Sequence, residues 1–468
     1  MANPPLPVEN STTSFWRSQS LHEIDNLRSP NFPSEADIVI IGAGYTGASL
    51  AYHILNLSPN SANKPSIVIL EAREACSGAT GRNGGHLKPD AFIKAAAALD
   101  EYGKEAAEEV ARFETRHIAA IGDLVRKEGI DCDFVVTRAI DVCLYDKAHH
   151  ELKAKLDKLR DAGVDVGDVF YSSGDTAAGF SGFKGARGCF STTTAHLWPY
   201  KLVTHLLAKA VSQGVNLQTW TPVSSVSSAP TSSGRYSVTT DRGTVAATKV
   251  IYATNGYTSA LLPSLSNKLV PVRGICSRIV CPPDAKKRAP LLTNSYIMRF
   301  NDHEYDYLIP RTDGSIIVGG ARRDYYHQLD SWYNVHDDSQ LMDKAEHYFD
   351  GYMQRHFHGW EDSGAVTESV WTGIMGYTGD GYPFVGRLPE AKGQFVCAGF
   401  NGHGMPQVFL SARAIAEIVV QGKGVDEVDL PQLYRLTEER LGRQKQHVSL
   451  AAHERFQNEK RRKEGAGG

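Results

Sequence analysis

Three glycines at fixed spacing, between a buried strand and a helix, constrain this chain more than any other feature of its sequence. Residues 37–41 read Asp-Ile-Val-Ile-Ile, a β-branched run typical of a strand covered on both faces, and Gly42-Ala-Gly-Tyr-Thr-Gly47 follows directly. Residues 48–57 then favour a helix, and residues 66–70 favour a second buried strand that ends at Glu71. This order predicts a βαβ unit with the glycine spacing of a dinucleotide-binding fold.

Each glycine of this unit has its own physical role. Gly42 permits the tight turn, Gly44 lets the backbone approach a pyrophosphate, and Gly47 allows the helix to pack closely on the strand. Glu71 would accept hydrogen bonds from the adenosine ribose, and its carboxylate argues against NADP. The alternative is a glycine-rich turn needed only for packing. The residues of this unit that we expect at the cofactor are Gly42, Gly44, Tyr45, Thr46, Gly47, Glu71, Ala72 and Arg73.

The composition excludes several classes of protein. With 468 residues, 41% of them hydrophobic, and 50 basic against 53 acidic residues, the chain reads as globular, with no charge excess that would gather nucleic acid. Its seven cysteines are scattered and never spaced C-x-x-C, so we expect neither disulfides nor a metal site. We find no apolar stretch long enough to span a membrane, and we expect a cytoplasmic protein.

A second run of small residues follows the βαβ unit. A nicotinamide-binding unit has no need of this run, whereas an extended small-residue backbone could pass under an isoalloxazine ring and offer donors to its edge and to the pyrophosphate. A flexible surface loop is the alternative. The residues that we expect to contact the cofactor here are Ser77, Gly78, Ala79, Thr80, Arg82, Asn83, Gly84, Gly85 and His86.

Five stretches together resemble the D-amino-acid oxidase-like family of FAD-dependent oxidoreductases, which includes glycine, sarcosine and gamma-glutamylputrescine oxidases. They are spread over nearly the whole chain in the family's order, and the Arg-Asn-Gly-Gly form looks closest to the gamma-glutamylputrescine oxidase branch. The matching stretches are Ile40–Gly47, Ser77–Gly85, Ala253–Tyr257, Pro271–Gly274, and Trp371–Gly386 with Gly399–Met405.

The resemblance implies an α/β fold: a Rossmann-like FAD-binding domain with a β-rich substrate domain of mixed sheet and helices, both built from discontinuous segments. We expect a leader at 1–35, FAD-binding segments at 36–128, 196–264 and 366–425, substrate-domain segments at 129–195 and 265–365, and a C-terminal helical tail at 426–468.

The resemblance also extends the set of cofactor residues. It implies contacts from Val223, from the Ala253–Gly256 turn, from the Trp371–Gly386 signature, and from a glycine-rich turn before a C-terminal helix, whose N-terminus would stabilise negative charge on the reduced ring. Gly373 falls where sarcosine oxidases carry the cysteine bonded to flavin, so FAD is expected to be non-covalent. The added residues are Val223, Ala253, Thr254, Asn255, Gly256, Trp371, Gly373, Asp380, Gly399, Phe400, Asn401, Gly402, His403, Gly404 and Met405.

The implied reaction is oxidation of an amine or amino-acid C–N bond to an imine, by hydride transfer to flavin N5, with reoxidation by dioxygen or another acceptor. The catalytic candidates are His403, Trp371, His86 and Tyr307, with Tyr257 beside them and Arg299 and Arg311 as possible carboxylate clamps. Each has a structural alternative: Tyr307 would pack on a strand face, Arg299 and Arg311 would be solvated at sheet edges, and His403 would bond to backbone at a helix start. Where sarcosine oxidases use a lysine on dioxygen, this chain has Ile317, which leaves the acceptor open.

Two other functions fit the same fingerprint. A flavin-dependent monooxygenase would reuse it but would consume NAD(P)H, and no second convincing glycine fingerprint is visible. A non-catalytic FAD-binding protein would stay yellow with every amine. The sequence does not decide which amine is the substrate, its stereochemistry or the oligomeric state.

Overall fold

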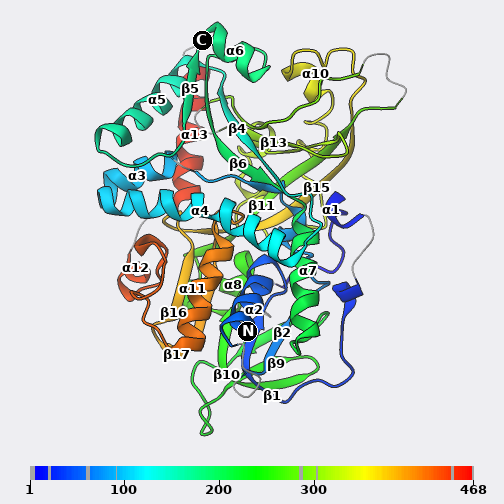
Figure 1. The fold of residues 1–468 in the computed structure, drawn as a ribbon, viewed down its shortest axis with the longest axis vertical. Helices are drawn as coiled ribbons and strands as arrows, with labels where there is room; N and C mark the ends of the chain where they lie inside the picture. Colours follow the sequence, from blue (N-terminus) through cyan, green and yellow to red (C-terminus); the bar gives the residue numbers. More distant parts are fainter. Residues whose placement is uncertain are drawn as a thin grey trace.

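The computed structural model describes residues 6–18, 23–58, 64–90, 92–283, 288–301, 304–443 and 447–465. Two mixed β-sheets form the centre of the molecule and follow one another along its long axis (Figure 1). None of the helices in the described part of the chain is long and apolar enough to cross a membrane. Within the same ranges, no group of three His, Cys, Asp or Glu side chains is arranged to hold a metal ion.

The first sheet has eight strands and is mainly parallel. Strand β1 lies in its middle, parallel to β10 on one side and to β2 on the other. Along the sheet the strands are β16 (Phe384–Leu388), β17 (Ala391–Ala398), β10 (Gly243–Tyr252), β1 (Glu35–Ile41), β2 (Ile67–Leu70) and β7 (Asn216–Gln218), with β9 (Tyr236–Thr240) and β8 (Val223–Val226) beside β10.

Strand β1 shows why this sheet needs cover on both faces. Ile38 and Ile40 pack into one apolar cluster with three helices, whereas Val39 and Ile41 pack into another cluster on the opposite face. Successive side chains of a strand point to opposite faces, so the unbroken β-branched run is satisfied only when both faces are buried. The three helices are α2 (Tyr45–Leu57), α7 (Pro199–Ser212) and α11 (Val408–Gln421).

The second sheet has nine strands, mostly antiparallel. In order they are β15 (Val366–Thr378), β11 (Leu269–Val280), β14 (Ile316–Gly319), β13 (Tyr305–Pro310), β12 (Ser295–Arg299), β4 (Val135–Cys143), β6 (Gly188–His196) and β3 (His86–Leu87), with β5 (Phe170–Ser173) on β6. Strands far apart in the sequence are therefore neighbours, as β12 and β4 are in parallel register.

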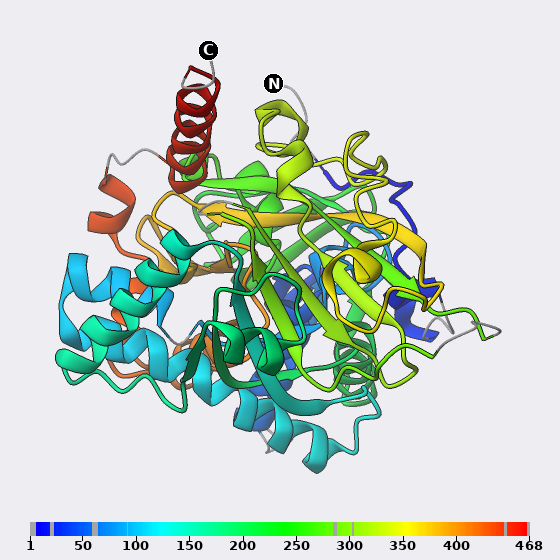
Figure 2. The ribbon, with the colours of Figure 1, turned by 90° about the horizontal axis from the view of Figure 1, so that it is seen from above.

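The remaining helices lie around the two sheets. Helices α3, α4 and α5 gather on one side of the molecule, and α13 stands at its periphery with the C-terminal end outermost (Figure 2). These helices are α1 (Phe15–Ser18), α3 (Ile93–Tyr102), α4 (Lys104–Glu128), α5 (Asp146–Asp161), α6 (Asp175–Ser181), α8 (Thr258–Leu261), α9 (Arg322–Tyr325), α10 (Tyr352–His356), α12 (Glu438–Gly442) and α13 (Val448–Gly465).

Two segments whose sequence predicts helices, residues 89–128 and a segment near 338–353, differ in the structure. The helical pattern over residues 89–128 is divided into α3 and α4 by Gly103, whose φ of +89° breaks the helix. A single helix over residues 338–353 is wrong, because turns occupy most of that range and α10 begins only at Tyr352. Gly351, at φ +65°, precedes it, and the hydroxyls of Tyr348 and Tyr352 both donate to Asp306 on strand β13.

The two ends of the chain pack on its body. In the expected leader, Phe15 and Trp16 are buried, and Trp198 donates from its indole to the Trp16 carbonyl at 2.9 Å. In the expected tail, His453 of α13 contacts the Tyr326 carbonyl at 2.9 Å. Leader residues 1–5 and 19–22 and tail residues 444–446 and 466–468 lie outside the described residues.

Candidate active site

A cavity of about 520 Å³ is lined by residues from both sheets, a size usual for cofactor and substrate sites. Most of the residues expected from the sequence line it. These are Gly42, Gly44, Tyr45, Thr46, Glu71, Ala72, Arg73, Ser77, Gly78, Ala79, Thr80, Arg82, Asn83, Gly84, His86, Val223, Ala253, Thr254, Asn255, Gly256, Tyr257, Arg299, Tyr307, Gly373, Phe400, Gly402, His403, Gly404 and Met405. The expected residues outside the lining are Gly47, Gly85, Arg311, Trp371, Asp380, Gly399 and Asn401.

The glycine turn after β1 has no room for side chains. Gly42 has a φ of +111°, and a Cβ there would lie 2.7 Å from the Ala253 carbonyl oxygen. A Cβ on Gly47 would lie 1.9 Å from the carbonyl oxygen of Gly42 itself. The chain therefore needs glycine at both positions to bring α2 against the end of β1, and Gly47 acts through this packing although it does not line the cavity.

The N-terminus of α2 faces the cavity through Tyr45 and Thr46. The Tyr45 N–H donates to the Thr80 hydroxyl at 2.9 Å, which joins the helix start to the small-residue loop. A Cβ on Gly44 would lie 3.0 Å from that hydroxyl, so backbone alone borders the helix start here. The first N–H groups of a helix have no partner within it and form a site for anions such as a pyrophosphate.

Glu71 lies at the end of β2 and lines the same part of the cavity. Its carboxylate oxygens accept from the Ala43 N–H at 2.7 Å and the Arg73 N–H at 3.1 Å, which fixes its orientation. Burial raises the pKa of Glu71, against those hydrogen bonds. Nearby, the Ser77 hydroxyl is buried and has no hydrogen-bond partner among the described residues, although Ser77 lines the cavity. These groups, with the glycine turn, fit a bound dinucleotide.

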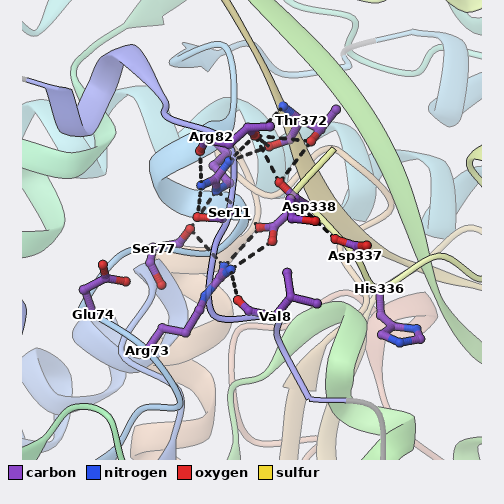
Figure 3. A network of polar contacts seen from close by, with 12 residues as sticks. Val8, Ser11, Arg73, Glu74, Ser77, Arg82, His336, Asp337, Asp338 and Thr372 are labelled. Atoms are coloured by element: carbon purple, nitrogen blue, oxygen red, sulfur yellow. Dashed lines mark hydrogen bonds and ion pairs between the residues drawn. The ribbon is translucent and has the colours of Figure 1, made fainter. Parts of the chain in front are cut away.

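Arg73 and Arg82 are held by the protein itself (Figure 3). The Arg73 guanidinium donates to both oxygens of the buried Asp338 carboxylate, at 2.9 and 3.0 Å. Arg82 donates from Nε to the Ser77 carbonyl at 2.9 Å and from Nη1 to the Thr372 carbonyl at 2.7 Å. The small-residue loop is thereby tied to β15 and to the segment before α10. Sequence reasoning missed Asp338, which lies in no motif.

The N-terminal segment completes this network (Figure 3) and also lines part of the cavity. Leu6 and Pro7 line the cavity. The Val8 carbonyl accepts from Arg73 Nη1 at 2.8 Å, and the Thr12 hydroxyl accepts from Arg82 Nη1 at 2.9 Å. Nothing in the polar composition of the leader indicated that Leu6, Pro7, Val8 and Thr12 would lie at the site.

Three of the expected residues lie behind the cavity. Trp371 is fully buried and donates from its indole to the Arg82 carbonyl at 2.8 Å, so it supports the small-residue loop. Asp380 pairs with Arg440, with contacts of 2.6 and 2.8 Å. Arg311 donates to Asp133 at 2.7 Å, and the Trp16 and Trp198 rings lie 5.0 and 4.6 Å from its guanidinium carbon. Arg311 therefore does not line the cavity, and the expectation that it clamps a carboxylate there is wrong.

His403 lines the cavity and is held by a carboxylate that sequence reasoning missed. Its Nε2 lies 2.9 Å from Glu114 of α4, a fully buried residue. Glu114 also accepts from the Gln407 amide at 2.6 Å, the Tyr434 hydroxyl at 3.1 Å and the Asp90 N–H at 2.7 Å. Burial disfavours the charge, but His403 and Lys94 hold the pKa of Glu114 below its usual range. In the sequence, Glu114 is one of several acidic residues between positions 89 and 128 and belongs to no motif.

On another part of the cavity wall, burial favours the neutral forms of Tyr307 and His86. A Cβ on Gly84 or on Gly319 would lie 2.2 Å from the Tyr307 ring, so the ring fills the space between the two glycines. Burial raises the pKa of Tyr307 well above its usual value and lowers that of His86 well below its own. His86 Nε2 lies 2.8 Å from the Ser295 hydroxyl. Ile317 is buried and does not line the cavity.

The cavity wall also contains Arg322, which sequence reasoning missed. Its guanidinium carbon lies 4.4 Å from the Tyr305 ring centre and 5.6 Å from that of Tyr326. Tyr325 and Tyr377 line the cavity beside it. Among the residues that the structure describes, no carboxylate pairs with Arg322 within 4.0 Å. Arg322 belongs to no sequence motif, so the sequence alone did not indicate that it lines the cavity.

The turn before Arg322 is fixed by a buried acid. Gly320 has a φ of +137° and Ala321 a φ of +56°, and the Ala321 N–H donates to Asp306 at 2.8 Å. Asp306 also accepts from the hydroxyls of Tyr348 and Tyr352, and burial raises its pKa to about 6. This arrangement directs the chain so that Arg322 enters the cavity.

The turn Gly42–Gly47 with the start of α2, Glu71 and Ser77, which we call the cradle, and a charged, aromatic part of the same cavity wall are together typical of a dinucleotide-dependent enzyme. The chain belongs to the DAO family of FAD dependent oxidoreductases, whose family model matches residues 37–418. FAD is its cofactor. The expected family and the α/β fold class are confirmed.

Two curated proteins illustrate the similarity. Glycine oxidase of Bacillus licheniformis is 23% identical over 391 residues, which span 82% of this chain and 93% of that protein. Gamma-glutamylputrescine oxidoreductase of Escherichia coli (strain K12) is 23% identical over 414 residues, which span 87% and 89%. The crystal structure of glycine oxidase from Geobacillus kaustophilus matches with a TM-score of 0.69 at 20% identity, over 86% of this chain and 99% of that one.

Proposed function

We propose that the protein oxidises the C–N bond of an amino acid to an imine, with FAD as the hydride acceptor. The observation that carries this proposal is Arg322, a cation without a carboxylate partner among the described residues, in a part of the cavity wall that also contains Tyr305 and Tyr325. A guanidinium in a low-dielectric wall favours a planar anion that accepts two parallel hydrogen bonds, which is the geometry of a carboxylate. The two similar proteins are named for glycine and for gamma-glutamylputrescine, both amines that carry a carboxylate.

The tyrosines around Arg322 argue against a simple amine as substrate. Tyrosine faces attract cations, and an aromatic cage often binds an ammonium group. Here the guanidinium of Arg322 already lies 4.4 Å from the Tyr305 ring, so the cage is occupied by the protein's own cation. The carboxylate of an amino acid would add to this arrangement, whereas a second cation would be repelled.

The part of the cavity near Tyr307 and His86 also favours the neutral form of the substrate amine. Its wall contains Tyr307, His86, Ile297 and Met375, and burial keeps both Tyr307 and His86 uncharged. Desolvation lowers the pKa of an amine, so the lone pair needed to form the C=N bond becomes available. A bound flavin supplies the hard step, acceptance of the hydride.

The electron acceptor after the amine is oxidised is dioxygen or another oxidant. Ile317 stands where sarcosine oxidases use a lysine on dioxygen, and its buried side chain carries no charge. Lys88 and His403 line the cavity and are the candidates for a cation beside reduced flavin. We further propose that FAD is non-covalent, because Gly373, with no thiol, lies where a Cβ would be 2.9 Å from that of Arg82.

We also propose that the chain forms an FAD-binding and a substrate-binding domain from discontinuous segments, and that the protein is cytoplasmic. The first sheet takes strands from the segments expected to bind FAD, and the second takes most of its strands from the segments expected to bind substrate. All seven cysteines are free thiols, which suits a reducing compartment such as the cytoplasm.

The test is anaerobic reduction of the bound flavin. Purified holoenzyme is mixed with amino acids of both configurations, with N-methyl amino acids, and with the corresponding amines that lack the carboxylate, and the flavin absorbance is followed. We expect bleaching by one of the carboxylate-bearing compounds and recovery when air or an artificial acceptor is added. Bleaching only by the amines, or by no compound, would overturn the proposal.

A further inference from the structure

The cations of this molecule fall into two groups that differ in their hydrogen bonds. Arg73 and Arg82, beside the cradle, each donate to several acceptors of the protein. In contrast, the side chains of Lys88, Arg299 and Arg322 donate no hydrogen bond to any residue that the structure describes. All three line the cavity. A cation without acceptors in a protein wall needs a ligand or water to satisfy its donors.

Lys88 and Arg299 share a single carboxylate. Lys88 Nζ lies 3.2 Å from Asp141, and Arg299 Nη2 lies 3.7 Å from the other oxygen of the same group. Asp141 has only 2% of its side chain exposed, while Lys88 and Arg299 have 11% and 20%. The Asp141 oxygen nearer Arg299 and the Arg299 Nε are both buried without a hydrogen-bond partner. One carboxylate thus faces two cations and leaves an excess positive charge.

Among the described residues, the other acids that line the cavity, Glu71 and Asp90, form no ion pair with Lys88 or Arg299. Asp90 lines the cavity, but its carboxylate accepts from the Ile93 N–H at 3.0 Å and forms no ion pair with Lys88 within 4.0 Å. Glu71 lies at the dinucleotide end and is held by the backbone. The positive charge is therefore balanced only when an anion enters.

Tyr305 separates this cluster from Arg322. Its ring centre lies 5.8 Å from the Arg299 guanidinium carbon and 4.4 Å from that of Arg322. Tyr305 is paired with Arg299 on adjacent strands, and Tyr307 is paired with Ile297 one step further along. The wall therefore presents two cationic positions, one on each side of a tyrosine and both within reach of one small molecule.

We propose that Lys88 and Arg299 form a second carboxylate subsite, and that the preferred substrate is an amino acid with two carboxylates. This inference rests on the proposed function, since Arg322 takes the first carboxylate and the amine lies between the two positions. A fork of guanidinium donors and an adjacent ammonium bind a carboxylate by charge-assisted hydrogen bonds, which are about twice as strong as neutral ones.

The test compares matched substrates on the holoenzyme. Aspartate and glutamate are compared with alanine and 2-aminobutyrate in both configurations, and iminodiacetate with N-methylglycine, by the substrate concentration that half-saturates anaerobic flavin reduction. We expect the dicarboxylates to saturate at least about tenfold lower. Arg299→Met and Lys88→Met should each reduce this gap severalfold, whereas Arg322→Met should weaken both classes. Arg323→Met, at an exposed position of α9, is the matched control and should change neither.

A binding measurement keeps the inference testable if the variants fail to fold or no amine reduces the flavin. Succinate and butyrate are titrated into wild-type holoenzyme at constant ionic strength, and the flavin spectrum is followed. Tighter binding of succinate supports the second subsite, and equal binding overturns it. If monocarboxylates reduce the flavin at concentrations as low as dicarboxylates, the second subsite is wrong while the proposed function stands. If only amines without carboxylates do so, both are wrong.

Discussion

The two ends of the cavity are built from different parts of the polypeptide. The cradle end is made mainly of backbone, with glycines that have no room for a Cβ and the N–H groups of a helix start. The arginines beside it, Arg73 and Arg82, already donate to acceptors of the protein. The substrate end is made of side chains: tyrosines, neutral His86, and cations whose donors are unused among the described residues. A backbone site recognises groups common to every FAD molecule, whereas a side-chain site can change its ligand by single substitutions.

The largest expected effect breaks the cradle. Gly47→Ala would place a Cβ 1.9 Å from the Gly42 carbonyl oxygen, and α2 must move away from β1. We expect purified variant to lack FAD, with binding at least about 100-fold weaker, because steric overlap of this size costs several kcal/mol. Gly179→Ala, where no atom lies within 4 Å of the added Cβ, is the control and should stay yellow. Retention of flavin by Gly47→Ala would show that the cradle tolerates side chains.

The next effect concerns Glu114, which joins α4 to His403. Its pKa is lower in the folded protein than its ordinary value of 4.5, so it stabilises the fold above that pH, and the contribution is lost as the pH falls below it. Glu114→Gln should lower the free energy of unfolding by about 3 kcal/mol at neutral pH. Denaturant titrations should show this difference shrinking below pH 4.5. The exposed Glu105→Gln, on the same helix, should change stability by less than about 0.5 kcal/mol. A difference that does not depend on pH would contradict an ionised Glu114.

Removing Arg322 tests the side-chain end alone. Arg322→Met keeps the apolar stem but removes the guanidinium, and the loss of about 2 kcal/mol of charge-assisted binding predicts a KM about 30-fold higher for a carboxylate-bearing substrate. FAD content should stay normal, because Arg322 lies at the opposite end of the cavity. Steady-state kinetics and flavin absorbance measure both quantities. Loss of FAD with an unchanged KM would reverse the assignment of the two ends.

The smallest effect tests the hydroxyl at the helix start. Thr80→Val removes the acceptor of the Tyr45 N–H and leaves that donor unsatisfied. We expect about 1 kcal/mol, or about fivefold weaker FAD binding. Thr80→Ser keeps the hydroxyl and should bind FAD as the wild type does, which equilibrium dialysis can measure. A Thr80→Val protein with unchanged affinity would mean that the cradle depends on glycine packing alone.

The same contrast explains what could be predicted from the sequence. Gly42, Gly44 and Thr80 lie in recognisable runs because backbone recognition demands a fixed local order of small residues. Arg322 and Glu114 act only through neighbours brought together by the fold, and a lone charged residue in a sequence is usually a solvated one. Periodicity likewise could not show that Gly351 would adopt a φ of +65°, with turns before it and α10 beginning only at Tyr352, in place of a single helix over residues 338–353.

Position in a motif was an incomplete guide even near the cofactor. Trp371 stands inside a family signature, yet the structure places it behind the small-residue loop, donating to the Arg82 carbonyl. Arg311 follows strand β13, from which Tyr305 and Tyr307 line the cavity, but its side chain lies against the aromatic rings of Phe15 and Trp16 in the leader. A motif fixes the path of the backbone, and the direction of each side chain depends on partners elsewhere in the chain.

The participation of Leu6 and Pro7 in the cavity wall has a consequence for biosynthesis. The wall also includes Val408, so segments that are synthesised at different times must meet to complete it. A nascent chain cannot assemble the complete pocket until that late residue has emerged, and its amino-terminal strap must wait without its partners until then. Loading with FAD is therefore expected only after Val408 has left the ribosome, and chains that stop before this residue should be colourless.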